Sequence, residues 1–232
     1  MNPVYVALDT TDLDYARQLA ERVRGSVGGL KLGLEFFSAH GPDGVRGFEG
    51  SGLPIFLDLK FHDIPNTVAG ACRAAAQLGV SIMNVHAQGG AAMMRAAVDA
   101  ARDVSPSIKV IAVTMLTSLS DEDLPSVGLM PPVAEQVLRL ASLARQCGLD
   151  GVVCSAHEIT RLRHELGPDF LLVVPGIRPA GAAVGDQRRV MGPAEARAGG
   201  ADILVIGRPI TAAADPGRAA REIAQSLGVP VA

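Results

Sequence analysis

The sequence contains no tryptophan, and aromatic residues make up only 3% of its 232 residues. Proteins that stack nucleic-acid bases rely on aromatic side chains, and proteins that follow a phosphate backbone rely on clusters of basic residues. Neither feature occurs here, because the formal net charge is −3 and no basic run is present. We therefore expect no nucleic-acid partner and no binding to an anionic membrane surface.

Cysteine is also scarce: Cys72, Cys147 and Cys154 are the three cysteines, and no pair has C-x-x-C spacing. This pattern predicts reduced thiols that pack inside a cytoplasmic protein. No apolar run approaches the ~20 residues of a membrane span. The N-terminus, MNPVYVALDTTDLDYARQL, lacks the basic start and apolar core of a signal peptide. We expect a cytoplasmic location and no contact with a membrane.

What the chain does have is a recurring strand pattern. Eight short runs rich in Val, Ile and Leu are flanked by Gly, Pro, Asp or Ser, which is typical of buried strands. These runs are VYVALD (4–9), GLKLGL (29–34), PIFLDLK (54–60), IMNVHA (82–87), KVIAVTML (109–116), GVVCSA (151–156), FLLVVPGIR (170–178) and DILVIGR (202–208). The clearest helical spacing between them lies at 13–24, 68–79, 90–103 and 132–148.

Alternating strands and helices of this number predict an α/β protein, a (β/α)8 TIM barrel that forms a single domain over residues 1–232. A doubly wound sheet is the alternative, although it usually has fewer strands. Two connections are long. Residues 117–131 are expected to carry a short helical turn, and 179–190 are interpreted as a lid over a bound ligand.

Charged residues gather at the predicted carboxyl ends of the strands, where barrels of this kind hold their active sites. The residues are Asp9, Lys31, Asp58, Lys60, Asp63, Arg178 and Arg208. Asp58 and Lys60 are two apart on one strand and should point into the barrel together, with Lys31 in reach from the strand before. A structural ion-pair network is the alternative, but burying each ion costs several kcal/mol, so that role gives little reason for four such groups together.

This pattern of alternating acids and lysines fits a particular chemistry. A lysine between carboxylates stays protonated and suits proton donation. A carboxylate beside a substrate carboxylate favours its loss as CO2, and the ammonium stabilises and then protonates the carbanion. The sequence therefore predicts decarboxylation, or proton transfer at a carbanion, without a cofactor. No histidine–carboxylate spacing supports a metal site.

The last two strand ends have the features of an anion site. Gly176 and Gly207 offer backbone N–H groups, and Arg178 and Arg208 add positive charge, as in the phosphate corner of many barrels. Two tight turns with solvated arginines are the alternative.

The segment Asp58-Leu-Lys60-Phe-His-Asp63-Ile-Pro-Asn-Thr67 reads D-x-K-x-x-D-I-P-N-T. With this motif the chain resembles the orotidine 5′-monophosphate decarboxylase family over essentially its whole length. The segments KLG, VTMLTS, VVPGIRP, GDQ and VIGRPI support the same resemblance. It implies decarboxylation of orotidine 5′-monophosphate to UMP and CO2 in pyrimidine biosynthesis, with no metal or organic cofactor.

The resemblance also implies roles for individual residues. Lys60 would donate the proton to carbon 6 of the pyrimidine, within a charged array of Lys31, Asp58, Lys60 and Asp63. The implied substrate contacts are Asp9, Lys31, Thr67, Thr117, Ser118, Pro175, Arg178, Gln187, Gly207 and Arg208. The family is a homodimer, so Asp63 and Thr67 would be contributed to the partner's site.

Three alternatives stay open. The first is a Mg²⁺-dependent phosphosugar decarboxylase of the 3-keto-gulonate 6-phosphate type, which has the shorter D-x-K-x-x-D motif. The second is an aldolase that forms a Schiff base on Lys60. The third is a barrel that binds a nucleotide without catalysis.

Overall fold

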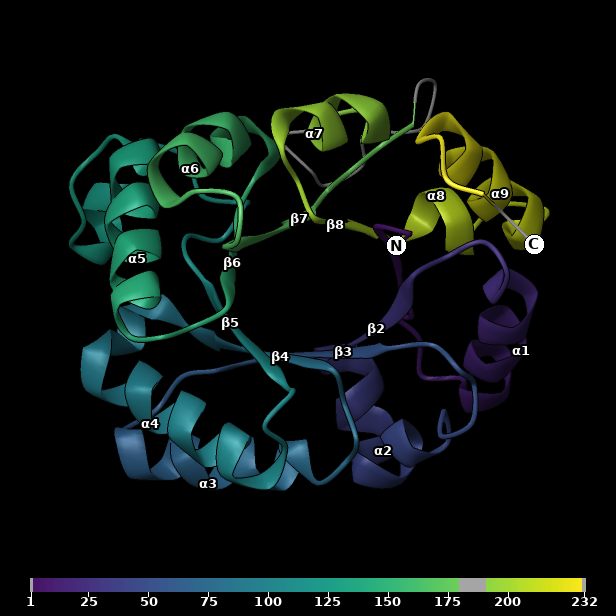
Figure 1. Cartoon of the computed structure of the whole chain (residues 1–232), viewed down its shortest axis with the longest axis horizontal. Helices are drawn as coiled ribbons and strands as arrows, with labels where there is room; N and C mark the ends of the chain where they lie inside the picture. Colours follow the sequence, from purple (N-terminus) through teal and green to yellow (C-terminus); the bar gives the residue numbers. More distant parts are fainter. Residues whose placement is uncertain (1, 180–190, 231–232) are drawn as a thin grey trace.

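The computed structural model describes residues 2–179 and 191–230. Its strands form one closed, all-parallel barrel in the order β1 to β8, with β8 paired to β1. The strands are β1 (Val4–Ala7), β2 (Gly29–Gly33), β3 (Ile55–Phe61), β4 (Ile82–His86), β5 (Lys109–Val113), β6 (Gly151–Val153), β7 (Leu171–Pro175) and β8 (Ile203–Ile206). Figure 1 looks into the ring of strands, with the helices around it. The predicted (β/α)8 barrel is confirmed.

Helices follow the strands along the chain and cover the outside of the barrel (Figure 1). They are α1 (Leu13–Val23), α2 (Leu34–Arg46), α3 (Pro65–Ala76), α4 (Gly90–Val104), α5 (Val133–Gln146), α6 (Ile159–Leu166), α7 (Pro193–Gly199), α8 (Arg208–Thr211) and α9 (Pro216–Ser226). Short 3-10 turns occur at η1 (Ala87–Gly89), η2 (Leu124–Val127) and η3 (Ala156–Glu158). The turn expected within 117–131 is η2. Within the described residues, no helix combines the length and apolar character that crossing a bilayer requires.

Two apolar layers hold these elements together. Inside the barrel, a small cluster is built around Tyr5, Phe56 and Ile111, with Val173 and Val205. Outside it, a large cluster fills the space between strands and helices and includes Leu57, Met93 and Met94. The strands are thus buried on both faces, which explains why they read as continuous apolar runs in the sequence.

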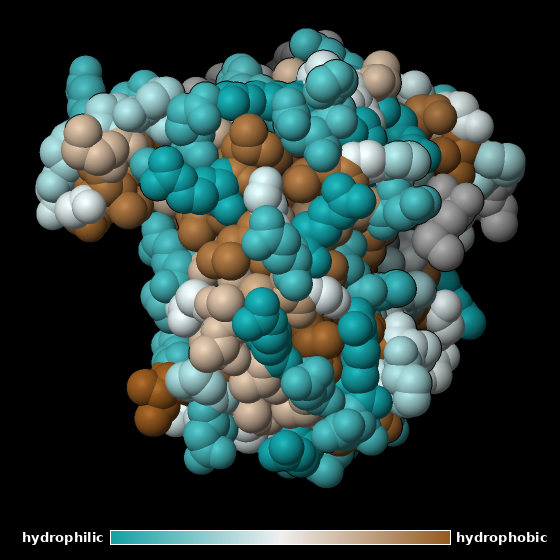
Figure 2. All heavy atoms as spheres, turned by 60° about the vertical axis from the view of Figure 1, so that its left-hand side comes forward, coloured by the Kyte–Doolittle hydropathy of each residue, from teal (hydrophilic) through white to brown (hydrophobic). Residues whose placement is uncertain are grey.

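The outer surface is not uniformly polar. Figure 2 shows strongly apolar residues mainly in the upper and middle parts of this face, and a paler, weakly apolar area in the lower half, at the height of α3 and α4 in Figure 1. The exposed face of α3 carries small residues, among them Thr67, Gly70 and Ala74. Large exposed apolar side chains lie within three residues of strand ends, at Leu34, Ile64 and Leu116.

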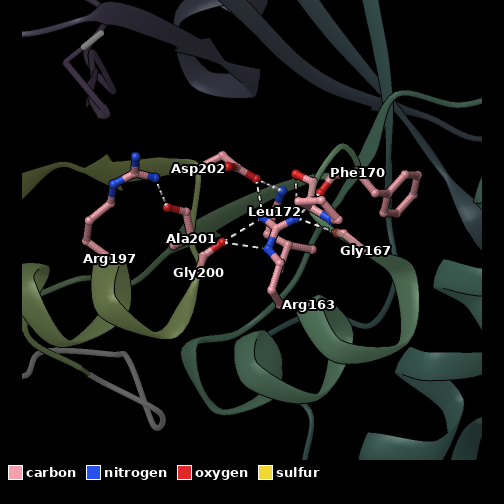
Figure 3. Close-up of polar contacts among 9 residues, drawn as sticks. Arg163, Gly167, Phe170, Leu172, Arg197, Gly200, Ala201 and Asp202 are labelled. Atoms are coloured by element: carbon pink, nitrogen blue, oxygen red, sulfur yellow. Dashed lines mark hydrogen bonds and ion pairs between the residues drawn. The ribbon is translucent and has the colours of Figure 1, made fainter.

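At the amino ends of the strands, Arg163 of α6 ties several segments together (Figure 3). Its guanidinium donates hydrogen bonds to the Asp202 carboxylate at 2.5 Å and to the Gly200 carbonyl at 2.6 and 3.2 Å. It also donates to the carbonyls of Gly167, Pro168 and Phe170. Asp202 in turn accepts the N–H of Leu172, which links the start of β8 to the start of β7. We call this group the Arg163 clamp.

A second group repeats the arrangement two strands earlier. Arg102 of α4 donates to the Gly148 carbonyl and to Asp150, both at 3.1 Å. Asp150 accepts the N–H of Val110, so it links the start of β6 to the start of β5. In both groups the acid belongs to a Gly-x-Asp sequence that directly precedes an even-numbered strand. The repeat marks the amino ends of the barrel as a structural face.

Candidate active site

Four charged side chains meet at the carboxyl ends of β1, β2 and β3. Lys31 Nζ lies 3.0 Å from Asp9 Oδ1 and 3.3 Å from Asp58 Oδ2. Lys60 Nζ lies 2.7 Å from Asp58 Oδ1. The predicted contact between the lysines and Asp58 is confirmed, and the result is an alternating chain of acids and bases. Lys31 and Asp58 are both buried.

The backbone departs from a regular strand where Asp58 and Lys60 stand. β3 and β4 pair at Leu57 with Met83 and again at Phe61 with Val85, so the register shifts between these pairs. Lys60 has φ of 53° and is the one non-glycine residue with a positive φ among the described residues. Such a left-handed conformation costs about 1–2 kcal/mol for an L-residue. The bulge therefore holds Lys60 in a strained position that a regular strand would not give it.

Asn84 of β4 fills the gap in the register. Its Oδ1 accepts the N–H of Lys60 at 2.8 Å, and its Nδ2 donates to Asp58 Oδ1 at 2.7 Å. Sequence reasoning missed this residue. The signal in the sequence was the amide in the middle of the mostly apolar strand IMNVH. A buried polar side chain needs hydrogen-bond partners, so such a residue indicates nearby polar groups.

The electrostatics favour an ionised Asp58. Burial alone raises the pKa of its carboxyl, but the charges of Lys31 and Lys60 and the hydrogen bonds from Lys60 and Asn84 outweigh it. The net pKa of Asp58 lies below its usual value. The carboxyl is therefore a carboxylate at neutral pH, and each adjacent lysine faces a negative charge.

A cavity of about 500 Å³ opens above this chain of charges. On one side it is lined by Asp9, Lys31, Asp58 and Lys60. Its other lining residues include Thr117, Pro175, Gly176, Arg178, Gly207 and Arg208. The two arginines that the sequence assigned to an anion thus share one cavity with the two lysines. Gly176 has φ of 77°, which suits a glycine at the turn after β7.

Other residues of the predicted site lie elsewhere. Asp63 and Thr67 are exposed at the rim, and Ser118 is exposed as well. Asp63 Oδ1 accepts the N–H of Ile64, and among the described residues Asp63 makes no ion pair with its own chain. Gln187 falls outside the described residues. Pro65 begins α3, three residues before the helical spacing that the sequence indicated, and Thr67 lies in its first turn.

Two histidines pack beside the bulge. The rings of His62 and His86 stack with centroids 5.3 Å apart. Burial, followed by electrostatic interactions with His62 and Lys60, lowers the pKa of His86 below its usual value and so favours its neutral form at pH 7. Across the described residues, no three His, Cys, Asp or Glu side chains are grouped so that they could hold a metal ion.

Known proteins match the chain over its length. The sequence model of the "Orotidine 5′-phosphate decarboxylase / HUMPS family" matches residues 2–223. An orotidine 5′-phosphate decarboxylase from Paramagnetospirillum magneticum is 56% identical, with 99% of this chain and 100% of that protein covered. One from Rhodospirillum rubrum is 57% identical, with 97% and 94% covered. The crystal structure of an orotidine 5′-phosphate decarboxylase from Lactobacillus acidophilus superposes with a TM-score of 0.88 at 39% identity, covering 99% of this chain and 100% of that one.

Proposed function

The chain belongs to the orotidine 5′-phosphate decarboxylase family, and we propose that it converts orotidine 5′-monophosphate to UMP and CO2 with Lys60 as the proton donor. The observation that carries the mechanism is the contact between Asp58 and Lys60 in the cavity, with Arg178 and Arg208 among its other lining residues. A cavity lined by both lysines and both arginines suits a nucleotide with a carboxylate on its base and a phosphate on its ribose.

The reaction breaks the bond between carbon 6 of the pyrimidine and its carboxylate. The bonding electron pair stays on carbon 6, and CO2 leaves. Lys60 then transfers a proton from its ammonium to carbon 6, and the resulting amine regains a proton from solvent. Lys60 Nζ already lies 2.7 Å from the Asp58 carboxylate in the free protein, so the proton donor is in place before substrate arrives.

Each remaining residue has a proposed part. Asp58, which is ionised, lies beside the leaving carboxylate, repels it and contributes to its loss. Asp9 and Lys31 hold the ribose hydroxyls, and Thr117 contacts the base. The phosphate is bound by Arg178, Gly207 and Arg208. The family resemblance adds Gln187 to this end, and gives Pro175 and Ser118 as further substrate contacts, with Ser118 near the base. Remote phosphate contacts then supply binding energy that orients the reacting ring.

We propose a homodimer in which Asp63 and Thr67 complete the site of the partner subunit. Three features support this. Asp63 stands at the rim without an ion pair within the described part of its own chain. Ile64 next to it is 67% exposed. The small exposed residues of α3 would let another chain approach closely, and the surface at this height in Figure 2 is weakly apolar.

The whole of residues 1–232 is proposed to act as one catalytic domain, since the family match spans most of it. A cytoplasmic location is also proposed, supported by the burial of all three cysteines inside the fold.

The test of the reaction is turnover of orotidine 5′-monophosphate in excess EDTA, followed by ultraviolet absorbance as UMP forms. Turnover that survives EDTA supports the proposal. No turnover by a folded protein that still binds UMP would refute it and favour a binding barrel. Activity on a keto-sugar phosphate that requires Mg²⁺ would instead favour the phosphosugar decarboxylase. Borohydride trapping on Lys60 with a ketone phosphate would reveal an aldolase.

The shared site is tested by mixing inactive subunits. Lys60→Ala and Asp63→Ala subunits should regain up to about one quarter of wild-type activity, because half of the dimers are mixed and half of their sites are intact. The matched control mixes Lys60→Ala with Asp58→Ala, whose lesions fall in the same chain's half of the site, and should regain nothing. Equal recovery in both mixtures, or none in either after confirmed exchange, would contradict a shared site.

A further inference from the structure

Asn84 lies beneath the reacting residues and has no part in the mechanism above. Its side chain is completely buried in β4, and both of its polar atoms are used. We propose that Asn84 is a positioning residue that sets the geometry of Asp58 and Lys60 together, an inference that rests on the proposed function of that pair.

The first reason is where its two hydrogen bonds go. One holds the backbone N–H of Lys60 and the other holds the Asp58 oxygen that also accepts Lys60 Nζ. A single amide therefore fixes both ends of the contact between the proton donor and its carboxylate. An ordinary buried amide satisfies nearby backbone groups, as Gln136 does with the carbonyl of Met130.

The second reason is the bulge. Between the regular pairs at Leu57 and Phe61, three residues of β3 face the single residue Asn84 on β4. The strands separate there, and the side-chain Oδ1 of Asn84 accepts the Lys60 N–H across the gap. A left-handed lysine persists only where its surroundings hold it, and this hydrogen bond is the contact that holds its backbone.

The third reason is that the amide meets a need that an acid or an apolar residue cannot. Leucine of similar size would leave the Lys60 N–H without its acceptor and would remove one of the hydrogen-bond donors to Asp58. Aspartate would keep the acceptor but place a second carboxylate against Asp58, and two carboxylates sharing a site raise one pKa strongly. Only a side chain with one acceptor and one donor at this spacing serves both residues.

The charged and titratable groups around Asp58 come from four strands. Lys31 on β2 and Lys60 on β3 lower the pKa of Asp58. Asp9, after β1, contacts Lys31, and His86, at the end of β4, is a neighbour whose own pKa responds to Asp58. Glu35, Arg178 and Arg208 line the same cavity farther from the carboxyl. Asn84 is uncharged, so its replacement by leucine changes the charge of Asp58 only through a lost hydrogen bond and a moved lysine.

The experiment compares Asn84→Leu and Asn84→Asp with Gln136→Leu as a matched loss of a buried amide. Turnover of orotidine 5′-monophosphate, calorimetric binding of UMP and thermal unfolding are measured for each. In Asn84→Leu, kcat should fall about 100-fold while UMP affinity stays within about threefold, since a misplaced reacting group costs turnover more than remote binding. Gln136→Leu should lose thermal stability and keep kcat.

The pH profile gives a readout that a merely structural role would not move. The acidic limb of kcat/KM should shift upward in Asn84→Asp, by at least about one pH unit, and less in Asn84→Leu. The pKa of the Asp58 carboxyl can also be measured without substrate by carbon-13 NMR titration, with its signal assigned by comparison with Asp58→Asn. This pKa should rise more in Asn84→Asp than in Asn84→Leu.

Either of two results would overturn the proposal. One is a folded Asn84→Leu variant whose kcat stays near wild type, or whose UMP affinity falls as much as kcat. The other is an unchanged acidic limb in Asn84→Asp, which decides the matter if Asn84→Leu does not fold. If the wild type itself does not turn over the substrate, the proposed function fails, and the NMR titration still tests whether Asn84 controls Asp58.

Discussion

Replacing Arg163 by alanine should destabilise the protein strongly and leave its catalysis intact. The guanidinium donates to four backbone carbonyls and to Asp202, and its side chain is only 20% exposed. Removing it leaves a mostly buried carboxylate and several carbonyls without their donor. Losing one partner of such a group costs about 3 kcal/mol. In a chain of this size that lowers Tm by about 6–12 °C.

The same helix supplies a matched control. Arg161 also forms an ion pair, with Glu135 at 2.7 Å. The side chains of Arg161 and Glu135 are, however, 43% and 50% exposed to solvent. Surface pairs of this kind contribute at most about 1 kcal/mol, so Arg161→Ala should lower Tm by no more than about 3 °C. Both variants remove an arginine from α6. They differ in how buried that arginine is and in how many carbonyls accept its hydrogen bonds.

The assay is thermal unfolding of both variants at one protein concentration, together with kcat and KM at 25 °C. The Arg163 clamp lies before β8, whereas Gly207 of the cavity lies after it, about 15 Å away at 3.3 Å per residue. Kinetic constants of the folded fraction should therefore be unchanged. Equal Tm losses in the two variants would refute the claim that burial makes Arg163 more stabilising than Arg161. A fall in kcat would refute the claim that the amino ends of the strands do not affect the cavity at their carboxyl ends.

Three further predictions concern the catalytic end and the core. Lys60→Ala should abolish turnover and keep measurable UMP binding by calorimetry; a near-normal rate would exclude Lys60 as the proton donor. Gly33→Ala should lower kcat/KM at least about tenfold with little loss of Tm, because its Cβ would lie 2.7 Å from Lys31 Nζ and 2.9 Å from Asp9 Oδ1 and both flexible ends must move. Burial raises the pKa of the Cys72 thiol to about 12, and all three cysteines are buried. The native protein should therefore not react with a thiol reagent until it is unfolded. Fast labelling of the native protein would contradict this packing.

The strands could be predicted because each is buried on both faces and so reads as a continuous apolar run. The helices were harder. α1 keeps a regular apolar spacing through Ala16, Leu19, Ala20 and Val23, whereas α2 is broken by Gly41 and Pro42, and Gly41 has φ of 57°. An interrupted period carries a weak signal, so α2 was not among the clearest helices in the sequence.

The charged chain was predictable for a similar reason. Asp58 and Lys60 are conspicuous in an apolar strand, and period-two alternation places them on one face. What alternation could not give is the bulge, the left-handed Lys60 or the amide that holds it, because register between strands depends on pairing across a gap in sequence. The proposed role of Asp63 could not be derived from the pattern either. The residues that it would join lie on another chain, and the periodicity of one chain says nothing about contacts between chains.

The pairing that closes the barrel also sets an order on how the protein is made. Val4 pairs with Leu204, so β1 stands unpaired on one side until the last strand leaves the ribosome. At synthesis rates of 5–20 residues per second, that interval lasts about 10–40 s. Asp9, Lys31, Asp58 and Lys60 are all translated early in it. The nascent chain therefore carries its most costly charges before the barrel that shields them exists, and release of β8 is the event that commits them to their places.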